Sequence, residues 1–418
     1  MRILPHDQTV LDAIAGREAE IVDRAIGWCA INSGSRNLDG LSHQHDVLQG
    51  VLAALPGEVE SLSLEPSERV TDAGDIRQDE FGAALRVTVR PDAPVQVVLT
   101  GHYDTVYPAT SPFTTVTPRE DGALNGPGIA DMKGGISVML AALEAFEAHP
   151  DRDRVGYRLL LSPDEEIGSL GSAPLLAELG RIGHVGLTFE PAMADGALAS
   201  SRKGSGNFHI LVKGQAAHAG RDFASGRNAV AGAAQIAAAL HALNGERDSV
   251  TVNVAQISGG SPLNVVPDTA VVRFNVRVPD QASAEWVRNE IERIVIAEPL
   301  TGQHGLKVSL HGGFTRPAKP LDASQQALLE AVRAAGALLG QEIAWKPSGG
   351  VCEGNNLHAA GLPNVDTLGV RGGDIHSENE YAWPQSFVER AQLSAMLLMK
   401  LASGEIDAPG LKRLRTGA

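Results

Sequence analysis

Three short runs between Val97 and Glu166 constrain this chain most, because each ends in imidazole or acidic side chains beside Gly and Pro. The runs read VVLTGHYDTVYP, NGPGIADMKGG and LLLSPDEEIGS. Open α/β sheets place their chemistry at the carboxyl ends of strands, so we expect these endings to meet at one sheet edge. The sequence therefore predicts an α/β fold with a polar site built from segments far apart along the chain.

The first two runs supply His102, Asp104 and Asp131. In an extended strand, positions two apart face the same side, so the Asp104 carboxylate can hold one imidazole nitrogen of His102 while the other faces a metal. Asp131 follows the turn-forming residues 125–128 and precedes the apolar helix ISVMLAALEAF. A carboxylate at that point can offer one oxygen to each of two cations.

The third run ends in the adjacent pair Glu165 and Glu166. Neighbours on a bent strand end can point to different tasks, so one can bind a metal while the other handles a proton. Taken singly, an HxD run is usually a polar turn, Asp131 can cap a helix, and a Glu pair is usually a solvated face. The combination of oxygen and imidazole groups without cysteine favours two divalent cations, zinc first.

These motifs resemble the three N-terminal motifs of the M20 metallopeptidase family. That family includes glutamate carboxypeptidases, aminoacylases, acetylornithine deacetylases and succinyl-diaminopimelate desuccinylases. Two further matches follow in order, Phe189-Glu190-Pro191 and the run from Gly373 to Ser377 that leads to Glu380-Tyr381. The resemblance covers nearly the whole chain and implies a zinc-exopeptidase-like α/β catalytic domain with an inserted dimerisation domain.

The resemblance also implies two divalent metal ions per subunit, with zinc expected and cobalt or manganese as alternatives. Each ion would have three protein ligands, with one carboxylate shared: His102, Asp131 and Glu190 at one ion, and Asp131, Glu166 and His376 at the other. Two such ions lower the pKa of a shared water towards neutrality. Glu165 would take the proton from that water and pass it to the leaving amine nitrogen of an amide.

The order of elements changes at about Ser205, which predicts a second domain. With 418 residues the chain is too long for one ordinary core. The second segment reads strand, helix, strand, strand, helix, strand, which is the ferredoxin-like β-α-β-β-α-β unit. We therefore expect a catalytic domain of residues 1–204 and 318–418 around a dimerisation domain of residues 205–317. Its helix at 227–243 is almost entirely apolar and predicts a homodimer.

Four residues of this insert are candidates for contact with substrate. His218 lies in KGQAAHAG, where a lone histidine is more often a surface residue. The resemblance implies that it reaches the partner's active site and donates a hydrogen bond to the reacting carbonyl oxygen. Asn264, Arg277 and Arg316 also match substrate-contacting positions. Because guanidinium groups pair with carboxylates, the two arginines are expected to grip a free carboxylate, although surface salt bridges explain them equally well.

The segment SGGVCEGNN departs from the family pattern. It has Cys352 and Glu353 where many members have Ser or Ala followed by Asp. We expect Glu353 to be a longer carboxylate behind the metal ligands. Cys352 is expected to be a packed small side chain, with a metal-ligand or redox role as the alternative. Arg371 is not matched to a family position and is a candidate for added positive charge at the substrate site.

Two local expectations concern the N-terminal region. Residues 9–32 read as one amphipathic helix. His43 and His45 are expected on the surface of the next helix, because positions two apart do not share a helix face.

Composition narrows the partners and the compartment. The formal net charge of −15 argues against a nucleic acid or an anionic membrane as partner. The two cysteines are far apart and imply no disulfide framework. The start of the chain lacks a long apolar stretch, so a cytoplasmic location is expected.

The motifs exclude several other enzyme classes. A dinucleotide site would need a glycine where Asp131 stands, and the chain has no GxSxG or HExxH motif. We expect hydrolysis of the amide bond of a small N-acyl or peptidyl amino acid with a free carboxylate, in the manner of a glutamate carboxypeptidase. Arg316 and the run RKGSG favour that prediction over an acetylornithine deacetylase or desuccinylase-like N-deacylase. The remote alternative is a non-catalytic metal-stabilised dimer.

Overall fold

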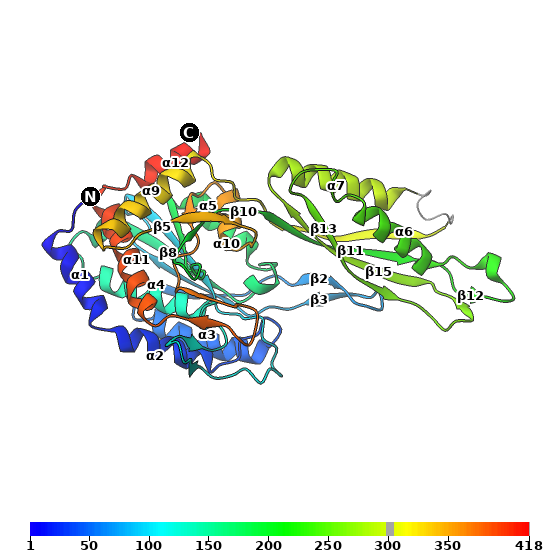
Figure 1. The fold of residues 1–418 in the computed structure, drawn as a ribbon, viewed down its shortest axis with the longest axis horizontal. Helices are drawn as coiled ribbons and strands as arrows, with labels where there is room; N and C mark the ends of the chain where they lie inside the picture. The colour runs from blue at the N-terminus through cyan, green and yellow to red at the C-terminus, as the bar shows by residue number, and fades with distance from the viewer. Residues whose placement is uncertain (298–304, 418) are drawn as a thin grey trace. The chain divides into compact units, whose positions relative to one another are not determined.

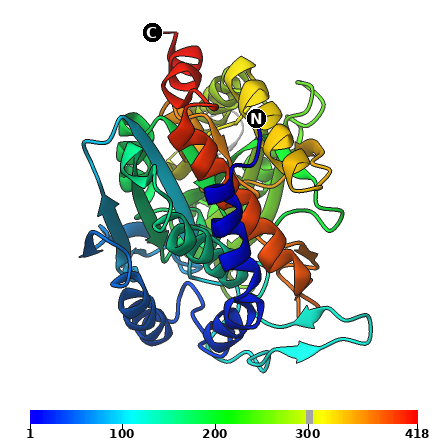
Figure 2. The ribbon, with the colours of Figure 1, turned by 90° about the vertical axis from the view of Figure 1, so that its left-hand side faces the viewer.

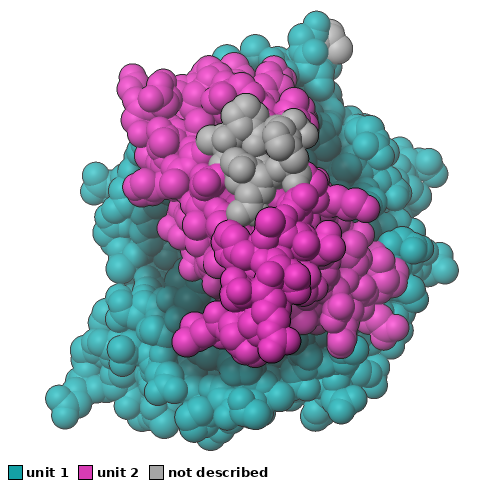
Figure 3. Space-filling model, turned by 90° about the vertical axis from the view of Figure 1, so that its right-hand side faces the viewer, with its two compact units in different colours: residues 1–65, 81–201, 321–418 teal, residues 66–80, 202–320 magenta. Residues whose placement is uncertain are grey.

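The computed structural model describes residues 1–297 and 305–417. Within that part the chain forms two compact units, shown in different colours in Figure 3. Unit 1 comprises residues 1–65, 81–201 and 321–418, and unit 2 comprises residues 66–80 and 202–320. The assignment of catalysis to one segment and dimerisation to the other remains a prediction.

Unit 1 is built on a six-stranded mixed sheet in the order β1-β4-β8-β5-β9-β18 (Figure 1). Strands β8, β5, β9 and β18 run parallel, whereas β4 and β1 are antiparallel to their neighbours. In sheet order the strands are β1 (Glu58–Leu62), β4 (Ala84–Val89), β8 (Val155–Ser162), β5 (Val95–His102), β9 (Val185–Thr188) and β18 (Asn364–Val365).

Helices cover both faces of this sheet because its central strands are apolar at nearly every position. Side chains alternate across a strand, so Val97 and Leu99 enter the larger core while Val98 enters a smaller one on the other face. Figure 2 shows α1 lying along α11, and the two helices are in contact. The helices are α1 (Pro5–Ala15), α2 (Glu18–Cys29), α3 (Leu38–Leu52), α4 (Lys133–Phe146), α5 (Ala173–Ile182), α9 (Ala323–Leu338), α10 (Glu353–Ala359), α11 (Gln385–Ser403) and α12 (Ala408–Thr416).

Small sheets and turns complete unit 1. One four-stranded sheet has the order β19-β20-β7-β6, and β10 pairs with β17. These strands are β19 (Gly372–Gly373), β20 (Tyr381–Ala382), β7 (Leu124–Asn125), β6 (Thr117–Pro118), β10 (Leu198–Arg202) and β17 (Trp345–Ser348). The 3-10 turns are η1 (Arg152–Arg154) and η2 (Glu165–Ile167).

The N-terminal region differs from expectation in two ways. The single helix predicted over 9–32 is wrong, because the chain breaks at Gly16 and Arg17 into α1 and α2. Glycine is a poor helix former, and the Arg17 guanidinium pairs with Glu144 of α4 at 2.7 Å. His45 is buried rather than on the surface, and its Nε2 lies 2.8 Å from a serine hydroxyl of β1. His43 is exposed as expected.

Unit 2 contains the predicted ferredoxin-like arrangement. Its four-stranded sheet has the order β13-β15-β11-β16, with every pair antiparallel. Helices α6 and α7 share one hydrophobic core with one face of this sheet (Figure 1). In chain order the main elements are β11 (Gly204–Lys213), α6 (Ala229–His241), β13 (Thr251–Gly259), β15 (Thr269–Val278), α7 (Gln281–Ile296) and β16 (Lys307–Arg316). Smaller elements are β12 (Ala217–His218), η3 (Phe223–Ser225) and β14 (Val265–Val266).

A hairpin from the N-terminal third of the chain packs on the other face of this sheet. It consists of β2 (Ser67–Val70) and β3 (Ile76–Asp79). Val70 forms a small buried cluster with Leu211 and Val271, and the Arg273 guanidinium donates to the Val70 carbonyl at 2.9 Å. The sequence boundaries did not anticipate this segment, because its assignment to unit 2 depends on contacts between distant positions.

None of the helices in the described part of the chain has both the length and the apolar composition that crossing a bilayer requires.

Candidate active site

The candidate site lies at the carboxyl ends of three parallel strands of unit 1. His102 is the last residue of β5, Glu165 and Glu166 form η2 just after β8, and Glu190 follows β9. Strands β5, β8 and β9 are hydrogen-bonded in parallel, so their carboxyl ends share one edge. This edge is where the sequence predicted the chemistry.

The predicted metal ligands form two groups that share Asp131. In the first group, His102 Nε2 lies 3.1 Å from Asp131 Oδ1 and 3.8 Å from Glu190 Oε1. In the second, His376 Nε2 lies 3.3 Å from Asp131 Oδ2 and 3.1 Å from Glu166 Oε2. The ligand atoms of each group lie within 4.8 Å of one another. The two Asp131 oxygens thus face different groups, which is the geometry of a bridging carboxylate.

Asp104 lies behind the first group and is fully buried. Its carboxylate is 3.3 Å from His102 Nδ1, although the nearer acceptor for that nitrogen is the Asp104 carbonyl at 3.0 Å. The carboxylate also accepts hydrogen bonds from the backbone N–H groups of Glu165 and Glu166, each at 3.1 Å, and from the Ser35 hydroxyl at 2.7 Å. Asp104 therefore fixes both the histidine and the glutamate pair.

The electrostatics show a surplus of buried negative charge. Burial raises the pKa of Glu190 to about 7, against the opposing effect of His102. Burial and the Asp131 charge hold the pKa of Glu166 well above its ordinary value. Burial alone would lower the pKa of His102, yet neighbouring carboxylates, led by Glu190, hold it well above its ordinary value. Hydrogen bonds to Asp131 and Glu166 raise the pKa of His376 to about 11.

The residues present fit divalent cations. Glu190 Oε1 is buried and finds no hydrogen-bond donor among the described residues. Two imidazoles face three carboxylates with oxygen and nitrogen donors only, which is a donor set suited to zinc, cobalt or manganese. A buried, unpaired carboxylate oxygen is costly unless a cation or donor reaches it.

Glu165 belongs to neither group found among the described residues. Its charge nevertheless acts on both Glu166 and Glu190, raising the pKa of each. Its backbone N–H is held by Asp104, so the side chain starts from a fixed point beside both groups. Of the two adjacent glutamates, Glu166 therefore lies in a candidate ligand group and Glu165 lies in neither, and their separate roles remain a prediction.

Two residues that were not predicted from the sequence contribute to this edge. Ser35 donates to Asp104, and no motif surrounds it. Glu380, which belongs to the motif that contains His376, accepts hydrogen bonds from the loop that carries Asp131. The position of Glu380 at the end of the motif that contains His376 was the one feature of the sequence that could have indicated this role.

Two candidate substrate residues lie close together in unit 2. His218 is on β12 and is exposed, and its Nδ1 accepts the backbone N–H of Gly220 at 3.1 Å. Asn264 is exposed too, and its backbone carbonyl accepts the backbone N–H of Ala219 at 2.8 Å. The pairing of β12 with β14 therefore places both predicted residues on one small structure.

The two candidate arginines lie on strands that flank the start of β11. Arg277 and Arg316 are both register partners of Ser205, from opposite sides. Arg316 is buried and Arg277 is half-buried, and burial lowers the pKa of Arg277. Arg277 Nε donates to Asn275 at 3.0 Å, whereas its buried Nη1 has no acceptor among the described residues.

The unusual segment near Cys352 is buried beside the sheet. The Ser162 hydroxyl at the end of β8 donates a short hydrogen bond to Glu353, so this carboxylate braces the strand that leads to the glutamate pair. Cys352 is a buried thiol that caps α10 by accepting the Gly354 N–H. Arg371 pairs with Glu389 at 3.2 Å.

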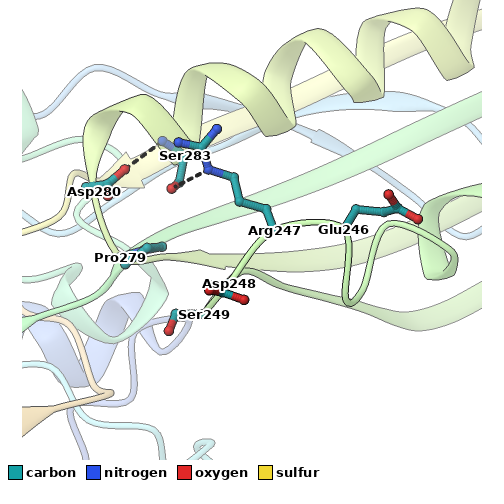
Figure 4. A pocket seen from close by; sticks show the side chains of 7 residues that line it. All are labelled: Glu246, Arg247, Asp248, Ser249, Pro279, Asp280 and Ser283. Carbon is teal, nitrogen blue, oxygen red and sulfur yellow. Dashed lines mark hydrogen bonds between the residues drawn. The ribbon is translucent and has the colours of Figure 1, made fainter.

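Two other polar clusters do not resemble an active site. His6, His149 and Asp151 lie close enough to bind a cation, but both ring nitrogens of His149 already have partners, Asp7 and the Asp151 N–H. In unit 2, Figure 4 shows a shallow hollow beside the start of α7, where Arg247 donates to Ser283 at 3.0 Å. The hollow is lined by Glu246, Arg247, Asp248, Ser249, Pro279, Asp280 and Ser283.

An α/β sheet with two overlapping groups of histidine and carboxylate ligands at its carboxyl edge defines a metal-dependent hydrolase. A family model described as peptidase family M20/M25/M40 matches residues 98–400, well over half of the chain. The chain therefore belongs to this family and is a metallopeptidase of the M20 type. The family, fold class and hydrolase activity predicted from the sequence are thereby confirmed.

Individual relatives represent both kinds of chemistry that the sequence suggested. Carboxypeptidase G2 of Pseudomonas sp. (strain RS-16) is 28% identical over 319 residues, which cover 74% of each chain. A succinyl-diaminopimelate desuccinylase of Nitrosospira multiformis is 30% identical over 313 residues, covering 69% of this chain and 79% of that protein.

Solved structures share the fold at low identity. An M20 family metallo-carboxypeptidase of Sulfolobus solfataricus aligns with a TM-score of 0.67 at 16% identity, covering 91% of this chain and 98% of that chain. The YxeP protein of Bacillus subtilis, described as a dinuclear metal-binding peptidase, aligns with a TM-score of 0.61 at 16% identity, covering 93% and 99%.

Proposed function

We propose that this protein is an exopeptidase of the glutamate-carboxypeptidase type that holds two divalent cations, zinc first, with cobalt or manganese as alternatives. Asp131 carries this proposal, because its two oxygens face two separate histidines. One cation would bind His102, Asp131 and Glu190, and the other Asp131, Glu166 and His376. The YxeP protein of Bacillus subtilis, a dinuclear metal-binding peptidase with a similar fold, supports the same number of ions.

The chain's own residues divide the chemistry. Bound cations supply the Lewis acidity that lets water attack an amide near neutral pH. Glu165 acts as general base and then as general acid, taking a proton from the attacking water and giving it to the leaving amine nitrogen. Asp104 keeps His102 and the glutamate backbone in position. His218 donates a hydrogen bond to the carbonyl oxygen as negative charge develops there.

A free carboxylate on the substrate would be recognised by unit 2. The buried Nη1 of Arg277 has no acceptor among the described residues, and an incoming carboxylate would supply one. Arg316 flanks the same register position, and Asn264 accompanies His218. We propose a homodimer through unit 2, in which His218 serves the active site of the partner subunit. A cytoplasmic location also remains our prediction.

A second candidate is an N-deacylase of the desuccinylase type, favoured by the 30% identity to the Nitrosospira multiformis protein. The exopeptidase and the N-deacylase would both hydrolyse the amide bond of a substrate that carries a carboxylate. They would differ in the acyl group of the substrate that the site accepts. Fold and ligands do not separate them, because the discrimination lies in loop shape.

A product screen tests the proposal. Protein loaded with zinc or cobalt is incubated with folyl and other N-acyl amino acids, N-succinyl diamino acids and short acetyl amides, and the released amine is identified. Release of glutamate-like amino acids from large acyl groups supports the exopeptidase. Activity restricted to short acyl amides supports the deacylase, and absence of metal-dependent hydrolysis across the panel refutes both.

A variant of the proposed base tests the division of labour. Glu165→Gln should bind both ions with nearly normal affinity yet lose on the order of 10²–10⁴-fold in turnover. Metal content is measured by atomic emission after dialysis. If Glu165→Gln loses its metal in proportion to its activity, Glu165 is a ligand and the assignment is wrong.

A further inference from the structure

We infer that Glu380 is a positioning residue that sets the spacing between the two cation sites. This inference rests on the proposed binuclear function. Glu380 touches neither ligand group through a ligand atom. Its carboxylate instead organises the backbone on which Asp131 is mounted, and it follows His376 by four positions in the same loop.

The Glu380 carboxylate collects four hydrogen bonds. Oε1 accepts the backbone N–H groups of Ala130 at 2.9 Å and Asp131 at 3.0 Å. Oε2 accepts the N–H of Gly128 at 3.0 Å and the hydroxyl of Tyr107 at 2.7 Å. The side chain is buried, so these bonds have little competition from water. Three backbone N–H groups of the loop that carries Asp131 thus depend on one carboxylate.

Backbone hydrogen bonds around Glu380 also connect the Asp131 loop with the His376 loop. Its carbonyl accepts the Asn125 side-chain amide at 2.7 Å and the Gly126 N–H at 3.1 Å. Next along the chain, Tyr381 is a register partner of Asn125 in the pairing of β20 with β7. The Tyr107 hydroxyl oxygen also lies 2.7 Å from the carbonyl oxygen of Ser377, one residue after His376, so Glu380 Oε2 and this carbonyl share its single proton. The Asp131 loop and the His376 loop are therefore tied together at several points.

The His376 loop needs such a support because its conformation is strained. His376 has φ +64° and Asp374 has φ +53°, in the left-handed region that side chains other than glycine adopt at a cost. The His376 side chain is 53% exposed, so packing does little to hold it. Hydrogen bonds from Glu380 and Tyr107 supply the constraint that packing does not.

This arrangement predicts an asymmetric effect on the two sites. The group of Asp131, Glu166 and His376 depends on Glu380 at both ends, through the Asp131 backbone and through the His376 loop. The group containing His102 and Glu190 depends on it only through Asp131. Loss of the carboxylate should therefore weaken the His376 site first. Supports behind metal ligands change affinity by roughly 10–100-fold in other proteins.

The test compares Glu380→Gln with Glu378→Gln, an exposed glutamate two residues earlier. An amide retains one acceptor oxygen but turns an N–H₂ group towards backbone donors, so Glu380→Gln should disturb the loop without removing bulk. Chelator competition measures the affinities for zinc and cobalt. In the cobalt-loaded protein, the absorption spectrum and the spin coupling between the two ions report on the two sites. The melting temperature of the metal-free protein shows whether the variant is folded. We expect Glu380→Gln to bind one cation within about threefold of wild type and the second about 10–100-fold more weakly, with reduced spin coupling. Glu378→Gln should match wild type.

Each outcome decides a separate point. Two cations bound by Glu380→Gln with wild-type affinity and coupling would overturn the role of Glu380 and leave the proposed function intact. Failure of the wild-type protein to bind two cations would overturn the proposed function itself. Equal weakening of both sites in step with a lower apo melting temperature would make Glu380 a general stabiliser and refute the inference. If Glu380→Gln does not fold, Tyr107→Phe removes one hydrogen bond to the same carboxylate and must show the same asymmetry at smaller amplitude.

Discussion

Replacing Asp104 by Asn tests the support behind the first cation site. An Asn side chain has one oxygen and one N–H₂ group, so one side of the former carboxylate must face a donor. The less costly orientation turns the N–H₂ group towards Ser35, whose hydroxyl can rotate to accept, and the Glu166 N–H is then left without its acceptor. Loss of a hydrogen bond to a charged group costs about 1.5–3 kcal/mol. We therefore expect roughly 10–100-fold weaker binding of the first cation.

The assay is chelator competition on apo protein, with zinc and then with cobalt. Ser35→Ala is the matched comparison, because it removes one hydrogen bond from the same carboxylate but keeps its charge and its bonds to the Glu165 and Glu166 N–H groups. We therefore expect it to weaken binding of the first cation less than Asp104→Asn does. Circular dichroism of both apo variants confirms that the fold is retained. Metal affinity within twofold of wild type in Asp104→Asn would refute the reasoning that Asp104 holds the site in place.

Three further predictions concern stability. Lys400 donates to the buried Asp7 carboxylate at 2.8 Å, so Lys400→Met should lower the free energy of unfolding by about 3–5 kcal/mol in urea titrations. Although burial alone would raise the pKa of Asp7, hydrogen bonds led by that from Lys400 hold it below its ordinary value of 3.8. The ionised Asp7 carboxylate therefore stabilises the fold above pH 3.8, and this stabilisation is lost as pH falls through the pKa of Asp7 in the folded protein. In Asp7→Asn the free energy of unfolding should fall less steeply with pH below about pH 4. The same pH dependence in Asp7→Asn and wild type would contradict this assignment. Gly135→Ala would place a methyl group 2.0 Å from the Phe189 carbonyl oxygen and should lower the free energy of unfolding by at least about 1–3 kcal/mol. Gly50→Ala, on an open helix face, should have a melting temperature at or above that of wild type. Equal melting temperatures of the two variants would refute the role of close packing at Gly135.

Local patterns in the sequence account for much of the fold. The nearly continuous apolar runs of β5 and β8, which are buried on both faces of the sheet, and the strand-helix order after Ser205 are patterns that each segment carries by itself. The break at Gly16 was missed because both halves of the predicted helix continue the same apolar pattern, whereas the pairing of Arg17 with Glu144 of α4 is a contact between distant positions. His45 was misplaced because a helix face does not reveal which strand will cover it.

The chain itself determined which groups can do chemistry here. The types and order of His102, Asp131, Glu166, Glu190 and His376 restrict the site to cations with oxygen and nitrogen ligands, whatever the packing around them. Residue type fixes donor atoms, and parallel strands bring their carboxyl ends to one edge, so the site was accessible to reasoning from short motifs.

Tertiary structure alone decided how those groups face one another. Three features depend on contacts between positions far apart in sequence. Asp131 turns one oxygen to each histidine, and Glu380 holds the loop that carries Asp131. The hairpin of β2 and β3 joins unit 2. Such contacts are selected by the packing of the whole unit, because a hydrogen bond or an apolar contact between distant segments leaves no periodic trace in either segment.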